Sequence, residues 1–260
     1  IIHHPDVKRM LLTMKSCAEA TRALTYQVSA LLDRAHAHPD EAERRRCQAT
    51  VDLLIPVVKG WSTETAFEVA SLGVQVHGGM GYIEETGAAQ HLRDARISTI
   101  YEGTTGIQAN DLVGRKVGRE AGATMKGLIA EMRKTVAGLA GSGDAELRAI
   151  GARLGKAIDA LERATDWIVA VFANDPGAVA AGSVYYLKLA GLAVGGWMMA
   201  RAAVAATRQL EAGEGDGAYL RGKRLTARFF ADHLLPQADS LAETMIAGGA
   251  LVRAAEEALV

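Results

Sequence analysis

Apolar residues recur at helical spacing along almost the whole chain, and this periodicity restricts the possible folds more than any other feature. After Pro5 and Asp6, one stripe of apolar side chains has the spacing of the buried face of an amphipathic helix: Val7, Leu11, Met14, Ala18, Leu24, Val28 and Leu31. Only five prolines occur in 260 residues, and no segment shows the sustained alternation that β-strands display. The sequence therefore predicts an all-α fold.

Start and stop signals divide this pattern into separate helices. In the first half we expect helices over these segments: about 5–38, 41–59, 62–77, 88–97 and from 105 past 117, with a kink or break at Pro56. In the second half, glycine-containing polar loops separate three further helical blocks: 145–172, 178–210 and 220–260, the last interrupted at Pro236. We expect two consecutive helical bundles joined near 114–122, with residues 1–117 as the first domain and residues 118–260 as the second.

Charge and cysteine usage argue against several classes of protein. Lysine and arginine total 29 against 30 aspartates and glutamates, so a net charge of −1 gives no electrostatic case for a nucleic-acid partner. The two cysteines, Cys17 and Cys47, form no CxxC pair or Cys/His cluster, which indicates neither a metal site nor a disulfide framework. A reduced, cytoplasmic location fits this usage.

One apolar segment, residues 177–200, is long enough to cross a membrane and carries a single charge, Lys188. Its many small residues keep the mean hydropathy modest, and the lysine would lie near mid-span. Gly191 and Gly195 would allow a neighbouring helix to pack closely. We therefore predict a buried bundle helix and no membrane span; the alternative is a peripheral membrane protein, which would partition into lipid or detergent.

The segment IYEGTTGIQ, residues 100–108, places an acid just before a predicted helix. Thr105 and Gln108 have the spacing of a capping box, so the helix should begin directly after Glu102. Unpaired N–H groups at such a start can hold a phosphate or a developing oxyanion. Partial burial between Tyr101 and Gly103 would strengthen Glu102 as a base. These residues alone favour the simpler interpretation, in which Glu102 complements the helix dipole.

A second segment, SLGVQVHGGMGY, has three glycines within residues 78–81. A glycine just past a helix end is an ordinary left-handed cap. Glycines also let a backbone approach a ligand closely, and consecutive N–H groups suit a phosphate. Taken alone, this segment favours the cap.

The longer segment QVHGGMGYIEETGAAQHLRDARISTIYEGTTGIQANDLVGRK resembles the carboxyl-terminal signature region of acyl-CoA dehydrogenases. The glycine stretch, the Arg93-Asp94 pair and YEGT recur in that family in this order and at this spacing. The opening segment, HPDVKRMLLTMKSCAEATRALTY, resembles the start of the family's final all-helical domain. The remainder, from about Gly118, is similar to the extra helical domain of the longer members. The resemblance covers essentially the whole chain and implies a portion of a longer enzyme.

The resemblance implies an FAD-dependent α,β-dehydrogenation of an acyl-CoA thioester to a trans-2-enoyl-CoA. In that family a hydride passes from the β-carbon to FAD while a glutamate removes the α-proton, and Glu102 occupies the position of this base. The backbone N–H of the base and a ribityl hydroxyl of the flavin hold the thioester oxygen. Tyr101 and Gly103 are then expected beside the substrate, with the glycine leaving room for the acyl chain.

The same resemblance assigns cofactor contacts to two groups of residues. The first, Gln75, Gly78 and Gly79, is expected to meet the adenine-nucleotide end of FAD bound by a neighbouring subunit. The second group, which follows the base, comprises Thr104, Thr105 and Gly106. A shared flavin implies a homodimer or higher homo-oligomer. The expected electron acceptor is an electron-transfer flavoprotein.

Three positions depart from the family pattern: Gln90 replaces a basic residue, Gly106 a frequent glutamine, and Gly114 an arginine near the CoA in shorter members. No CoA-binding arginine is therefore assigned. Family members also have an amino-terminal helical domain and a middle β-domain, which this chain lacks, so we expect the chain alone to be inactive. The rival interpretation is a non-catalytic helical interaction or oligomerisation module derived from the family. The sequence does not indicate the length or type of the acyl group.

Several other side chains are assigned structural roles. His77 and His91 are expected to form local hydrogen bonds, and Glu84 and Glu85 to lie in a solvated turn. We expect an ion pair within Arg93-Asp94 and predict core positions for the three tryptophans: Trp61, Trp167 and Trp197.

Overall fold

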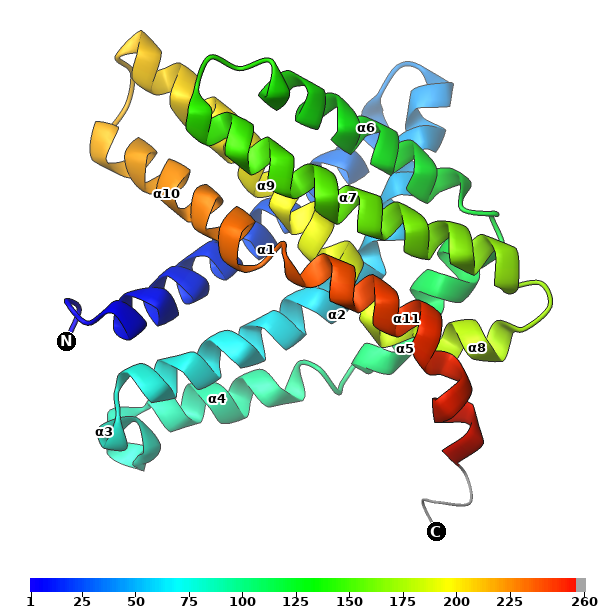
Figure 1. Cartoon of the computed structure of the whole chain (residues 1–260), viewed down its shortest axis with the longest axis horizontal. Helices are drawn as coiled ribbons and strands as arrows, with labels where there is room; N and C mark the ends of the chain where they lie inside the picture. Colours follow the sequence, from blue (N-terminus) through cyan, green and yellow to red (C-terminus); the bar gives the residue numbers. More distant parts are fainter. Residues whose placement is uncertain (256–260) are drawn as a thin grey trace.

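A computed structural model describes residues 1–255, and all regular structure in that range is helical. The elements, drawn in Figure 1, are α1 (Pro5–Ala37), α2 (Glu41–Val76), α3 (Gly79–Tyr82), the 3₁₀-helix η1 (Glu84–Thr86), α4 (Ala88–Ile97), α5 (Thr105–Asn110), the π-helix η2 (Asp111–Gly118), α6 (Ala123–Ala140), α7 (Ala145–Val171), α8 (Pro176–Ala181), α9 (Ser183–Ala212), α10 (Gly217–His233) and α11 (Gln237–Ala254). The predicted all-α fold is confirmed.

Helix α9 lies at the centre of the molecule (Figure 1) and packs against α1, α2 and α5 as well as α7, α10 and α11. It is long and apolar enough to cross a membrane, but 72% of its most apolar 18-residue window is buried inside the protein. The predicted buried bundle helix is therefore confirmed. A continuous hydrophobic core surrounds it and draws residues from both halves of the chain.

One close approach between the two halves is made by Trp61 of α2 and two glycines of α9. A Cβ atom built at Gly191 would lie 2.1 Å from Cγ of Trp61, and one at Gly195 would lie 2.5 Å from Cη2. Glycine at both positions therefore lets the indole lie directly on the α9 backbone. Trp61 is 4% exposed, as predicted for a core residue, whereas Trp167 and Trp197 pack only partly buried against the core. The domain division at residues 117 and 118 stays a prediction.

Several helix limits agree with the sequence signals, and others do not. The helix over 88–97 and the interruption at Pro236 are confirmed. The predicted break at Pro56 is wrong, because α2 runs through the proline and unites the segments 41–59 and 62–77. Pro56 is buried among Leu53, Leu54 and Val57, and this packing offsets the lost hydrogen bond, which costs about 3 kcal/mol in a helix interior. Further along, the expected block 178–210 is divided at Gly182 into α8 and α9.

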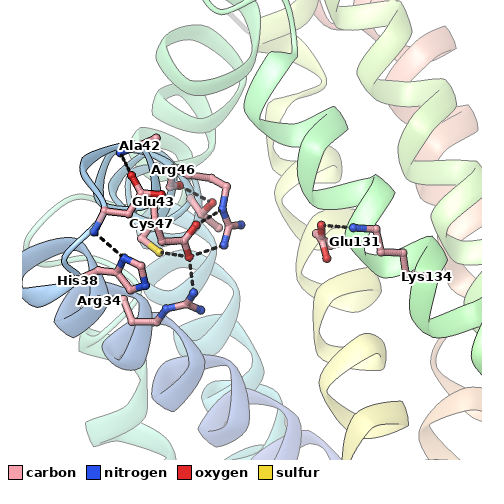
Figure 2. Close-up of polar contacts among 10 residues, drawn as sticks. Arg34, His38, Ala42, Glu43, Arg46, Cys47, Glu131 and Lys134 are labelled. Atoms are coloured by element: carbon pink, nitrogen blue, oxygen red, sulfur yellow. Dashed lines mark hydrogen bonds and ion pairs between the residues drawn. The ribbon is translucent and has the colours of Figure 1, made fainter.

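A polar cluster joins the end of α1 to the start of α2 (Figure 2). The carboxylate of Glu43 accepts hydrogen bonds from the guanidinium groups of Arg34 and Arg46, the latter through two bonds of 2.8 Å. The Cys47 thiol donates to the same carboxylate over 3.5 Å. The hydrogen bonds from Arg46 are the main reason that the pKa of Glu43 falls from 4.5 to about 2. The cluster thus links these two helices beside the turn that connects them.

Helices α2 and α4 lie side by side and form an arm with α3 at its tip (Figure 1). The loop that follows α4, residues 98–104, leads back to α5 near the centre of the molecule. The two motifs that the sequence singles out lie at opposite ends of α4.

Candidate functional site

The loop between α4 and α5 has an unusual backbone at the predicted base. Glu102 has a φ of +52° and Gly103 a φ of +94°, both in the left-handed region. Glycine adopts this region freely, but a glutamate there costs roughly 1–2 kcal/mol. Surrounding contacts must therefore hold the turn in place.

The helix start lies where the sequence predicts it, but its cap is one residue earlier. Thr104, not Thr105, is the N-cap residue, and its hydroxyl accepts a hydrogen bond from the Ile107 N–H at 3.3 Å. The Thr105 hydroxyl instead donates to a carboxylate oxygen of Glu64 on α2 over 2.5 Å. After the left-handed turn, Thr104 has the extended conformation that an N-cap requires. This conformation explains why the cap is Thr104 and not Thr105.

Lys59 of α2, a residue that no motif in the sequence marks, anchors this loop. Its ammonium group donates to the carbonyl of Gly103 at 2.5 Å and to the carbonyl of Ser98 at 2.9 Å. The same nitrogen lies 5.9 Å from the ring centroid of Tyr101. The available signal was a single lysine within the apolar run LLIPVVKGW of a helix.

The turn is rigidly placed but open to its surroundings. Tyr101 and Glu102 are exposed, so the partial burial expected for the carboxylate is not provided by residues 1–255. Within that range the N–H groups of Glu102 and Gly103 have no hydrogen-bond acceptor. An accessible carboxylate therefore lies beside accessible N–H donors, an arrangement that can remove a proton and hold a developing negative charge.

The glycines at the tip of the arm differ in how much space surrounds them. Close packing requires glycine at position 81, because a Cβ atom there would lie 2.2 Å from the carbonyl oxygen of Val74. Gly78 has a φ of +61°, and a Cβ atom at Gly78 or Gly79 would meet nothing within 4 Å among residues 1–255 apart from the adjoining residues and the local helix backbone. Both glycines and Gln75 are exposed, so an external group can approach this backbone closely.

The structure does not bring the two groups of predicted cofactor residues together. The group at the tip, Gln75, Gly78 and Gly79, is separated from Thr104, Thr105 and Gly106 by α4. Ten helical residues span roughly 15 Å. The two groups therefore lie at opposite ends of α4.

Two of the structural predictions concern residues near the arm. His77 forms the expected local contact, since its Nδ1 lies 2.8 Å from the carbonyl oxygen of Gly73. The predicted pair of Arg93 with Asp94 is wrong: Arg93 forms two hydrogen bonds of 2.8 and 2.9 Å with Glu84 in η1. Successive helical residues diverge by about 100°, so adjacent side chains in α4 do not meet. Among residues 1–255, no group of three or more potential ligands could hold a metal ion.

Two protein-family models match the chain. The model described as "Acyl-CoA dehydrogenase, C-terminal domain" matches residues 1–117. The model described as "Acetyl-CoA dehydrogenase C-terminal like" matches residues 128–256. Between them they cover most of the sequence.

Characterised relatives agree with these matches. The 3-methylmercaptopropionyl-CoA dehydrogenase of Ruegeria pomeroyi is 48% identical over 235 residues, which are 90% of this chain and 40% of that protein. The broad-specificity linear acyl-CoA dehydrogenase FadE5 of Mycobacterium tuberculosis is 34% identical over 254 residues, with coverages of 94% and 41%. The chain thus spans about 40% of the length of these relatives.

A solved structure shares the fold. An acyl-CoA dehydrogenase from Bacillus anthracis, complexed with FAD, superposes with a TM-score of 0.73 at 17% identity. The match covers 96% of this chain and 43% of the other.

Proposed function

This chain belongs to the acyl-CoA dehydrogenase family as its carboxyl-terminal helical part, and we propose that, within a longer polypeptide, it takes part in α,β-dehydrogenation of an acyl-CoA thioester. The product would be a trans-2-enoyl-CoA. The observation that carries the proposal is the left-handed turn at Glu102 and Gly103, held directly ahead of α5. A glutamate adopts this conformation only where its surroundings enforce it.

Glu102 is the proposed base for the α-proton. That proton is only weakly acidic, so the negative charge that develops on the thioester oxygen needs a donor close by. The N–H of Glu102, which has no acceptor within residues 1–255, can supply one hydrogen bond, and loss of such a donor typically slows a reaction about a hundredfold or more. Tyr101 and Gly103, on either side, would contact the substrate.

FAD, when bound, supplies the acceptor for the hydride from the β-carbon. On this chain Thr104, Thr105 and Gly106 would contact it beside the base. The Thr105 hydroxyl already donates to Glu64, so it retains only acceptor capacity toward a ligand. The exposed backbone of Gly78 and Gly79 fits a cofactor that approaches from outside the chain.

The resemblance to the family is what supports a cofactor shared between subunits. We therefore propose a homodimer or higher homo-oligomer, in which the tip of the arm meets the FAD of a neighbouring subunit. An electron-transfer flavoprotein is the proposed electron acceptor. Because the turn is exposed in this chain, the 260 residues alone should bind FAD weakly and leave acyl-CoA unoxidised.

The test uses a polypeptide extended to include the amino-terminal region found in the longer relatives. It is mixed anaerobically with linear acyl-CoA thioesters and 3-methylmercaptopropionyl-CoA while the visible flavin absorption is followed. Bleaching by the parent should be slowed about 10²–10⁴-fold by Glu102→Gln, the range expected for loss of a general base. Equal bleaching by both would place the base elsewhere. A product without flavin would instead favour a helical interaction or oligomerisation module.

A further inference from the structure

The left-handed turn at Glu102 needs a structural support, and the contacts around it show where the support lies. Within residues 98–104, the Tyr101 N–H is bonded to the carbonyl of Ile97, which continues the end of α4. Beyond the turn, the side chain of Gln108 reaches the carbonyl of Glu102 only over a long 3.4 Å. One backbone bond joins the beginning of the loop to the start of α5, because the Thr105 N–H donates to the carbonyl of Thr99 at 3.1 Å. None of these bonds holds the carbonyl of Gly103, the residue directly after the proposed base.

Lys59 holds the Gly103 carbonyl from a different helix and also binds the start of the loop. Its two carbonyl partners, Ser98 and Gly103, are the residue after α4 and the residue after the proposed base. Both bonds converge on one ammonium group, so the four residues between Ser98 and Gly103 are held at both ends by a single side chain. Because each peptide unit is planar, fixing the Gly103 carbonyl also fixes the adjoining bond to Thr104.

The environment of Lys59 fits this task better than a role in surface charge pairing. The side chain is half-buried, and none of the ion pairs found in residues 1–255 includes it. Two carbonyl dipoles and the ring of Tyr101 surround the charge instead. The neighbouring Gly60 keeps α2 close to α5, since a Cβ atom there would lie 3.3 Å from Cβ of Gln108.

We propose that Lys59 is a positioning residue that holds the carboxylate and the N–H of Glu102 in their reactive arrangement. This inference rests on the proposed function. Lys59 acts through the loop and not on the substrate, so its loss should slow the chemical step while leaving substrate affinity nearly unchanged. A displacement of about 1 Å at a reacting group can slow a reaction by about a hundredfold.

The first test compares Lys59→Met and Lys59→Arg in the extended, flavin-containing polypeptide. Methionine keeps much of the apolar stem and removes the charge, whereas arginine can still donate to two carbonyls. We expect Lys59→Met to slow flavin reduction about 10- to 100-fold with substrate affinity within about threefold of the parent. Lys59→Arg should recover most of the rate. Lys126→Met, which removes a distant ion pair with Asp166, is the control and should leave the rate unchanged.

The second test needs no activity and uses this 260-residue chain. Hydrogen exchange of the amides in residues 98–106 should become roughly tenfold or more faster in Lys59→Met, because a charged hydrogen-bond donor is lost. Arginine should restore slow exchange. An unchanged rate and unchanged exchange in Lys59→Met would overturn the proposal. If the parent reduces no flavin, the proposed function fails, and unchanged exchange would then remove the positioning role as well.

Discussion

At the scale of single residues, the loop before α5 shows how a local conformation can be more informative than a residue type. A glutamate before a helix commonly complements the helix dipole, and this simpler role requires no special backbone. Glu102 instead has a φ of +52°, and contacts from α2 surround its turn. Interaction with a dipole requires no such support. The backbone therefore favours the interpretation in which the position of the carboxylate matters for chemistry.

Glu43 gives a prediction about pH at the same scale. Its hydrogen bonds with Arg46 lower the pKa from 4.5 to about 2, so the folded state favours the charged carboxylate more than the unfolded state does. The resulting stabilisation is present above pH 4.5 and is lost as the pH falls toward 2. Glu43→Gln should therefore lower the free energy of unfolding at pH 7, and the difference from the parent should disappear as the pH approaches 2.

Urea denaturation at pH 7, 4.5, 3 and 2 would measure this difference. Glu41→Gln is the matched control, because Glu41 lies on the same helix in an exposed pair with Arg45. Exposed pairs contribute little, so the control should follow the parent at each pH. A constant deficit of Glu43→Gln down to pH 2 would contradict the argument.

The residue types of the site could be read from the sequence, but their connections could not. Thr105 and Gln108 have the spacing of a capping box, yet the left-handed turn moves the cap to Thr104. Lys59 lies 39 and 44 residues from its two carbonyl partners. Every residue has a backbone carbonyl, so the sequence does not indicate which ones accept a hydrogen bond from this lysine. Contacts of this kind depend on how helices pack, which local patterns do not specify.

At the scale of helices, local signals predicted the limits of periodic segments well. Helix limits that depend on packing against other helices were predicted poorly. The segment 88–97 was predicted with its observed limits, because Gly87 and the apolar spacing mark it locally. Pro56 signals a break that α2 does not have, because the buried residues around the proline favour a continuous helix despite a missing hydrogen bond. Helix α6 was not assigned separately, since its glycines at 127 and 138 weaken the helical signal.

Two glycines in helix interiors should respond in opposite ways to alanine. At Gly191 a Cβ atom would lie 2.1 Å from Trp61, so α9 and α2 would have to move apart. Gly191→Ala should lower the free energy of unfolding by about 1–3 kcal/mol or more, the usual effect of overpacking. At Gly127 the added carbon would meet nothing within 4 Å among residues 1–255 apart from the adjoining residues and the backbone of its own helix. Gly127→Ala should raise stability by about 0.5–1 kcal/mol through helix propensity.

Urea titration followed by circular dichroism would compare both variants with the parent under identical conditions. The Gly127 variant serves as the control for the general effect of replacing glycine in a helix. If Gly191→Ala were as stable as the parent, α2 and α9 would be less tightly packed than the structure indicates.

At the scale of the whole molecule, α9 connects the two predicted bundles. It belongs to the second half of the chain, yet Trp61 from the first half lies on its glycines. A division between residues 117 and 118 can therefore separate two structural units, but neither unit is expected to fold independently of the other. Separation would expose an apolar helix that now packs on both sides.

We accordingly expect the chain to unfold in one cooperative transition. Cys17 and Cys47 lie in the first half, are 8% and 0% exposed, and report on its opening. Burial also raises the pKa of Cys17 to about 12, so the folded protein should react slowly with thiol reagents at pH 7. Pulse labelling of both thiols across a urea series should give the same midpoint as circular dichroism at 222 nm, which reports on all helices. Labelling at lower urea than the loss of helicity would mean that the first half opens independently, and α9 would then not couple the two bundles.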